Sequence, residues 1–127
     1  MNPINVFSTI NILDDGPAVE VAIVVGFADF SRTNIKLKPK GNPAKVITNN
    51  AEIEKHYSLG KPSSLLNNVT MVCTGRLAAP QGATNSSFFV ICAFFQGSKH
   101  IGSSDPVSGK FAAGEAVQDF NIICTFV

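Results

Sequence analysis

The sequence predicts an all-β fold, an antiparallel β-sandwich of the Greek-key or jelly-roll type, formed by residues 1–127 as a single domain. Three observations lead to this prediction. Apolar residues recur at every second position along much of the chain, which is the period of a half-buried strand. Turn-forming Gly, Pro, Asn and Asp residues separate these runs. Only one segment has the features of a helix, and about seven short strands with almost no helix are typical of a sandwich or barrel.

Four of the expected strands lie in the first half of the chain. The first begins at residue 4, alternates apolar and polar residues as far as 12, and ends before the turn-forming sequence DDGP at 14–17. The second covers 19–28 and has one strongly apolar face and one weakly polar face. Residues 33–38 alternate again, and 44–48 form a shorter and weaker strand pattern.

The segment 49–60 differs from its surroundings and predicts one short helix in a connection. An Asn at 49 or 50 can cap its N-terminus, and Gly60-Lys61-Pro62 is expected to end it. Strand patterns then return at 69–77, 87–96 and 117–127. The last strand is too apolar to be a frayed tail, so we expect it to pair inside a sheet. The Gly- and Ser-rich stretch between the last two is expected to be a long loop with at most a short strand near His100.

The three cysteines share one local pattern, because Cys73, Cys92 and Cys124 each follow two apolar residues and precede Thr or Ala. Their neighbours two positions away are mostly apolar, which places each thiol on the buried face of a strand. Burial disfavours the thiolate, so these cysteines are expected to pack as small apolar side chains. An odd count without a Cys-x-x-Cys pair fits neither a disulfide framework nor a zinc site.

The strand SFFVICAFFQ at 87–96 is apolar on both faces. One face carries Phe88, Val90, Cys92 and Phe94, and the other carries Phe89, Ile91, Ala93 and Phe95. Because one face of an antiparallel sheet is commonly solvated, a second apolar face needs a second cover. The connection 49–68, another subunit and a lipid surface are the three candidates. We therefore predict an interface that contains Phe89, Ile91 and Phe95.

Composition and motifs argue against several classes of function. Charged residues make up 15% of the chain, against about 25% in typical globular proteins, which favours a surface that meets a partner. The net charge of +1 argues against a nucleic-acid-binding protein. His56 and His100 fall in segments that nothing in the sequence brings to a nucleophile, and no known catalytic motif is present. The sequence predicts no enzymatic activity, no metal and no cofactor.

The candidate binding residues are Lys36, Lys38, Lys40, Asn85 and Asp105. The lysines belong to a basic stretch that could meet an anionic lipid surface or a sulfated glycan. Alternatively, outward lysines on a short edge strand prevent sheets from aggregating edge to edge. Asn85 and Asp105 lie in loops rich in side chains that can bind sugar hydroxyls. The chain has only one Tyr and no Trp for stacking against a sugar, which weighs against a lectin.

The N-terminal residues have neither the basic region nor the apolar core of a signal peptide, and no apolar run is long enough for a transmembrane helix. We expect a protein that is cytoplasmic at synthesis, with leaderless export left open. The leading functional hypothesis is a non-enzymatic, self-associating structural or interaction protein that forms a homo-oligomer. The alternative is a ligand-binding sandwich, either a lectin or a membrane-surface-binding, toxin-like module.

Overall fold

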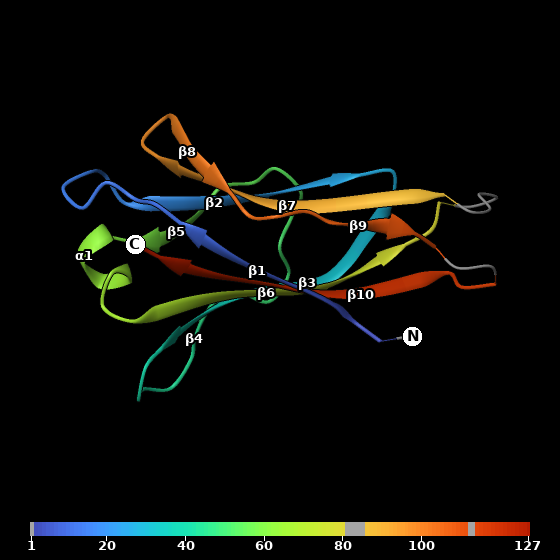
Figure 1. Ribbon diagram of the computed structural model, residues 1–127, viewed down its shortest axis with the longest axis horizontal. Helices are drawn as coiled ribbons and strands as arrows, with labels where there is room; N and C mark the ends of the chain where they lie inside the picture. The colour runs from blue at the N-terminus through green and yellow to red at the C-terminus, as the bar shows by residue number, and fades with distance from the viewer. Residues whose placement is uncertain (1, 81–85, 112–113) are drawn as a thin grey trace.

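The computed structural model describes residues 2–80, 86–111 and 114–127, which form two β-sheets packed face to face (Figure 1). The first sheet, here the β10 sheet, has the order β1 (Ile4–Ile10), β10 (Val117–Phe126), β6 (Val69–Ala78), β3 (Asp29–Pro39) and β4 (Lys45–Thr48). The second, the β7 sheet, has the order β5 (Tyr57–Gly60), β2 (Val19–Gly26), β7 (Ser87–Gln96) and β8 (Lys99–Ser103), with β9 (Val107–Lys110) also pairing with β7. The expected all-β sandwich is confirmed.

One strand pair departs from the antiparallel expectation. β1 runs parallel to β10, with Ile4 opposite Phe120 and Ile10 opposite Phe126. Parallel neighbours cannot be joined by a tight turn and need a long crossover. Here almost the whole chain separates the two strands and passes back and forth between the sheets, as it does in Greek-key folds. The final strand lies between β1 and β6, so the prediction that it pairs inside a sheet is confirmed.

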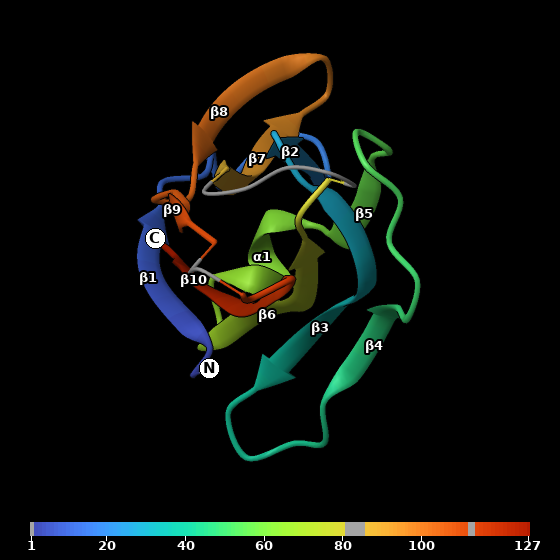
Figure 2. The same ribbon diagram turned by 90° about the vertical axis from the view of Figure 1, so that its right-hand side faces the viewer.

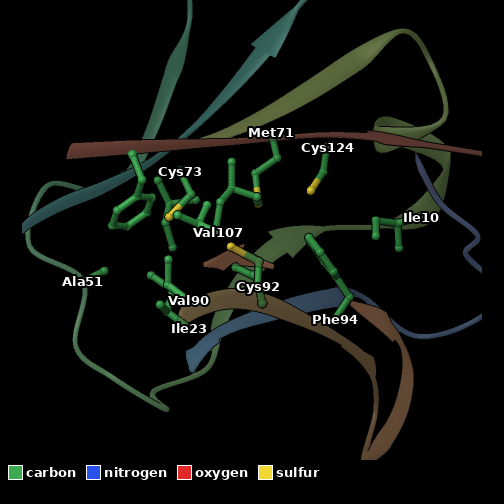
Figure 3. Close-up of a cluster of buried hydrophobic side chains, with 14 of the residues drawn as sticks. Ile10, Ile23, Ala51, Met71, Cys73, Val90, Cys92, Phe94, Val107 and Cys124 are labelled. Atoms are coloured by element: carbon green, nitrogen blue, oxygen red, sulfur yellow. The ribbon is translucent and has the colours of Figure 1, made fainter. Parts of the chain in front are cut away.

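The core lies between the sheets and follows the predicted alternation. Along β6 and β10, every second side chain is buried. Figure 3 shows the side chains that meet from the two layers, with Met71, Cys73 and Cys124 on one side and Ile23, Val90, Cys92 and Phe94 on the other. The face of β7 that points into the molecule is therefore the one that carries Cys92.

The prediction of one short helix in a connection is confirmed, but its position at 49–60 is wrong. The chain has no helix there, and its last four residues form β5, an edge strand that pairs with β2. The helix α1 (Pro62–Leu65) begins where the expected helix was to end. Pro62 lacks an N–H group and has a fixed φ angle, which suits the first turn of a helix, so it starts this helix and does not terminate another. Glu54, with φ of 64°, adopts a left-handed conformation that no right-handed helix can contain.

The helix α1 closes one end of the sandwich, between the two layers (Figures 1 and 2). Pro62 and Leu65 are its buried residues.

The Gly- and Ser-rich stretch between β7 and β10 contains two short strands. The strand expected near His100 is present as β8, whereas β9 was not predicted. Four residues with a single buried apolar side chain, Val107, do not establish a period.

Candidate binding surfaces

The three cysteines lie together in the core and not at a surface. All three are free and buried, and Figure 3 shows Cys92 pointing across the core toward the side of Cys73 and Cys124. Hydrogen bonding with Cys73, together with burial, raises the pKa of the Cys92 thiol well above 9.0. Burial raises the pKa of Cys124 to about 12. Neither thiol is an activated nucleophile, because both are held in the protonated form.

The outer face of the β7 sheet is apolar at its centre. On β2 and β7 the register places Val24 opposite Ile91 and Gly26 opposite Phe89. All of these residues point away from the core, and Val24, Phe89 and Ile91 are only partly buried. Phe27, in the turn after β2, is 74% exposed and meets the ring of Phe89 edge-on at 6.3 Å between centroids. We call Val24, Phe27, Phe89 and Ile91 the outer patch.

A glycine shapes this patch. A Cβ atom at Gly26 would overlap Cε1 and Cδ1 of the Phe89 ring, so the absence of a side chain at Gly26 leaves room for that ring beside β2. The ring in turn positions Phe27. Glycine opposite an aromatic residue on the neighbouring strand is a pairing in which the ring covers exposed backbone. Gly26 therefore provides the space that the Phe89 ring occupies in the outer patch.

The same face carries a polar cluster around Phe95. The imidazole of His56 stacks on Phe95 with 4.5 Å between ring centroids, and His100 meets the ring edge-on at 5.4 Å. His56 Nδ1 lies 3.1 Å from Glu20 Oε1, and His100 Nε2 lies 2.9 Å from Ser103 Oγ. Both histidines are exposed. Phe95 is half-buried, as Phe89 and Ile91 are, and its ring contacts two histidines of its own chain.

The outer face of the β10 sheet is mostly polar. Thr74 donates a hydrogen bond to Asn121 across 2.6 Å, and Asn121 donates another to Asn5 across 2.8 Å. In the next row, Arg76 pairs with Asp119 through two contacts of 2.6 and 3.1 Å. This hydrogen bonding and charge hold the pKa of the Asp119 carboxyl below 3.8. One apolar row crosses the face, and it ends at Phe7, which is 70% exposed.

The predicted lysines lie on or beyond β3, but their structural context differs from the expectation. β3 is long and runs between β6 and β4, so Lys36 and Lys38 are not on a short edge strand, and the edge-protection interpretation is wrong. Lys36 is half-buried and Lys38 exposed on the outer face of the β10 sheet. Lys40 lies in the turn between β3 and β4, where its backbone N–H donates to the carbonyl of Asn68 across 3.1 Å.

That backbone contact joins the two walls of a pocket of about 450 Å³, here called the hairpin pocket. One wall is the β3–β4 turn, and the other is the segment that contains α1 and the residues on both sides of it. The buried side chains of Leu37, Leu59 and Leu65 form its floor. Polar side chains surround its mouth, among them Lys40, Lys45, Asn42, Ser64, Asn67 and Asn68.

The remaining predicted residues do not join this pocket. Asp105 is exposed in the connection between β8 and β9, where its backbone N–H donates to Ser8 Oγ across 2.7 Å. The Nε2 atom of His100 lies 2.9 Å from Ser103 Oγ. Asn85 lies outside the described residues. The lysines and Asp105 therefore do not form one binding site.

Sequence reasoning misplaced Phe27 and missed the floor of the hairpin pocket. The alternation of 19–28 put Phe27 on the strongly apolar face of the strand, but β2 ends at Gly26 and Phe27, with φ of 64°, is exposed. Leu59 and Leu65 were placed in or beside an expected helix, so their approach to Leu37 was not visible. The sequence signal for this pocket was the lack of acidic residues from 30 to 51 and from 55 to 104, the stretches that contain its two walls.

In comparisons with known proteins, no family model, curated sequence or solved structure matches the chain. None of the helices among residues 2–80, 86–111 and 114–127 has the length and apolar character to cross a membrane. Within the same residues, no group of three or more His, Cys, Asp or Glu side chains could hold a metal ion. The functional argument rests on the surfaces of the chain itself.

Proposed function

We propose that the protein acts without catalysis, by associating with further copies of itself through the outer face of the β7 sheet. The observation that carries the proposal is the outer patch, in which partly buried apolar side chains on two central strands adjoin Phe27, 74% exposed. Contiguous apolar surface of this kind marks contact sites in folded proteins. Aromatic side chains are enriched at the centres of such contacts.

The contrast between the two sheets indicates which face is used. The outer face of the β10 sheet carries hydrogen-bonded Asn, Thr, Arg and Asp side chains, which water solvates well. The outer patch contains no charged residue. Polar side chains lie further along the same face, at Glu20 and His56, and polar residues commonly border the apolar centre of a contact. A second copy is the partner we favour, since two apolar faces of the same chain complement each other.

The test compares two isoleucines that differ in the sheet to which they belong. Ile91 on β7 and Ile123 on β10 are both half-buried on outer faces. We expect Ile91→Lys to reduce the mass of the assembly to that of a monomer, because a charge at the centre of an apolar contact is costly. Ile123→Lys is expected to leave the mass unchanged. Sedimentation velocity measures both, and circular dichroism checks that each variant is folded.

Two results contradict the proposal. If Ile91→Lys keeps the mass of the unsubstituted protein, the outer patch is not the contact. If Ile123→Lys alone dissociates the assembly, the contact lies on the β10 sheet, and the difference in polarity between the two outer faces does not identify the interface.

A further inference from the structure

We propose that the hairpin pocket binds an amphipathic anion, a molecule with one anionic head and a hydrocarbon body of the size of a medium-chain fatty acid. This inference does not rest on self-association, because the pocket lies at the end of the sandwich closed by α1 and shares no residue with the outer patch. Its volume of about 450 Å³ falls within the range of small-molecule sites, which is about 300–1,000 Å³.

The floor of the pocket provides the apolar half of the recognition. The buried Leu37, Leu59 and Leu65 fix the base of the pocket and expose only a small part of their surface to it, and the half-buried Pro39 and Val69 add further apolar lining. Side chains fixed in this way form a preformed apolar surface, so a hydrocarbon chain can bind without first ordering the site.

The mouth provides the charge. Lys40 and Lys45 both line the pocket, and neither forms an ion pair with any residue in the described part of the chain. The sequence has no acidic residue between Asp29 and Glu52, nor between Glu54 and Asp105, so nothing in either wall neutralises the lysines. Two unbalanced cations at the rim of a pocket attract an anion.

Amide and hydroxyl groups complete the rim. Asn42 and Asn68 can donate hydrogen bonds to a carboxylate beside the lysines. The Lys40–Asn68 backbone contact fixes the distance between the walls. A second hollow of about 600 Å³ shares Lys40 and Asn68 with the pocket and adds Lys38. Lys40 therefore lines both hollows, and its ammonium group can contact an anionic head group bound at the edge of either one.

The probe for the test is decanoate, with 1-decanol as a neutral ligand of the same length and acetate as an anion without a hydrocarbon body. We expect decanoate to shift the methyl resonances of Leu59 and Leu65 in a saturable NMR titration, and acetate to leave them unchanged. Decanol is expected to bind at least about fivefold more weakly, because it makes no charged contact with the lysines.

The matched variants change exposed lysines only, so folding is not at risk. Lys40→Gln with Lys45→Gln is expected to weaken decanoate binding by about tenfold and to leave decanol binding unchanged. Lys99→Gln, on β8, removes the same charge away from the pocket and is expected to leave decanoate binding unchanged. The proposal is overturned if decanoate causes no shift, or if the double variant binds decanoate as tightly as the unsubstituted protein.

A vesicle measurement identifies the source of the anion. Sedimentation with phosphatidylglycerol vesicles, lost in the Lys40→Gln, Lys45→Gln variant and accompanied by decanoate binding, assigns the pocket to a lipid. Decanoate binding without sedimentation assigns it to a free amphiphile. Sedimentation without any decanoate shift contradicts the pocket and assigns the lysines to a flat membrane surface.

Discussion

At the scale of single residues, the thiols illustrate how environment decides chemistry. Cys92 and Cys124 have raised pKa values because they are buried and because the thiols lie near one another. The sequence pattern was sufficient to predict this, since apolar neighbours two positions away identify a buried strand position. The sequence did not predict that the Cys92 thiol from one sheet lies near the Cys73 and Cys124 thiols from the other. Their proximity depends on how the two sheets pack against each other.

The raised pKa of Cys124 predicts a loss of stability in alkaline solution. In the unfolded chain the thiol loses its proton near its ordinary pKa of 9.0, whereas in the folded protein it keeps the proton to about 12. The contribution of this thiol to the free energy of unfolding is therefore fully present below pH 9 and is lost as the pH rises toward 12. At pH 10 the expected loss from this thiol is about 1.4 kcal/mol. Urea unfolding between pH 7.5 and 10 measures it. Cys124→Ala should show a shallower decline, and an equal decline would contradict the assignment.

Gly26 permits a second prediction at this scale. In Gly26→Ala the new methyl group overlaps the Phe89 ring, which must rotate away from β2. We expect a destabilisation of about 1–3 kcal/mol, as for other overpacked positions. Gly102→Ala on β8 is the control, because its Cβ would meet only Ile10 Cγ2 at 3.7 Å. Thermal unfolding of both variants tests the prediction, and equal stability of the two would show that the Phe89 ring adjusts without cost.

At the scale of elements, the strands with clear alternation were predicted well and the short ones were not. The period-two pattern gave 87–96 with the bounds that β7 has. β5 and β9 contain four residues each, too few to establish a period, and β5 was assigned to a helix. Alternation placed Phe89 and Ile91 on the same face of this strand, but only the structure shows that this face points outward. The hairpin pocket could not be predicted from alternation, because its two walls are segments that are distant in the sequence and meet only in the folded chain.

The connection between β1 and β2 depends on one buried side chain of β7. Gln96 Oε1 accepts a hydrogen bond from Leu13 N across 2.8 Å, and its Nε2 donates to the carbonyls of Leu13 and Pro17. We expect Gln96→Leu to cost about 2–3 kcal/mol, because it breaks three hydrogen bonds and leaves backbone groups unpaired.

Hydrogen exchange distinguishes this anchoring role from a general loss of stability. The amide of Leu13 should exchange faster in Gln96→Leu under native conditions. The amide of Ile12, which donates to the carbonyl of Val127 and makes no contact with Gln96, should keep its protection relative to global unfolding. If the Leu13 amide is as well protected as before, Gln96 does not hold the connection.

At the scale of the whole molecule, the two outer faces differ in polarity. The outer face of the β10 sheet is mostly hydrogen-bonded polar side chains, crossed by one apolar row that ends at Phe7, whereas the outer face of the β7 sheet carries the outer patch. The interface residues predicted from sequence divide accordingly. All three are half-buried; Phe89 and Ile91 belong to the outer patch, whereas Phe95 contacts His56 and His100. Composition alone indicated excess apolar surface, but only the sheet arrangement locates it.

Self-association is the central claim, and the native mass of the purified protein tests it most directly. Static light scattering across a concentration series should give a whole-number multiple of the 13.5 kDa chain mass, with a lower mass only on dilution. A mass of 13.5 kDa at every concentration would contradict the account. The outer patch would then be exposed on a monomer, and a different partner would have to cover it.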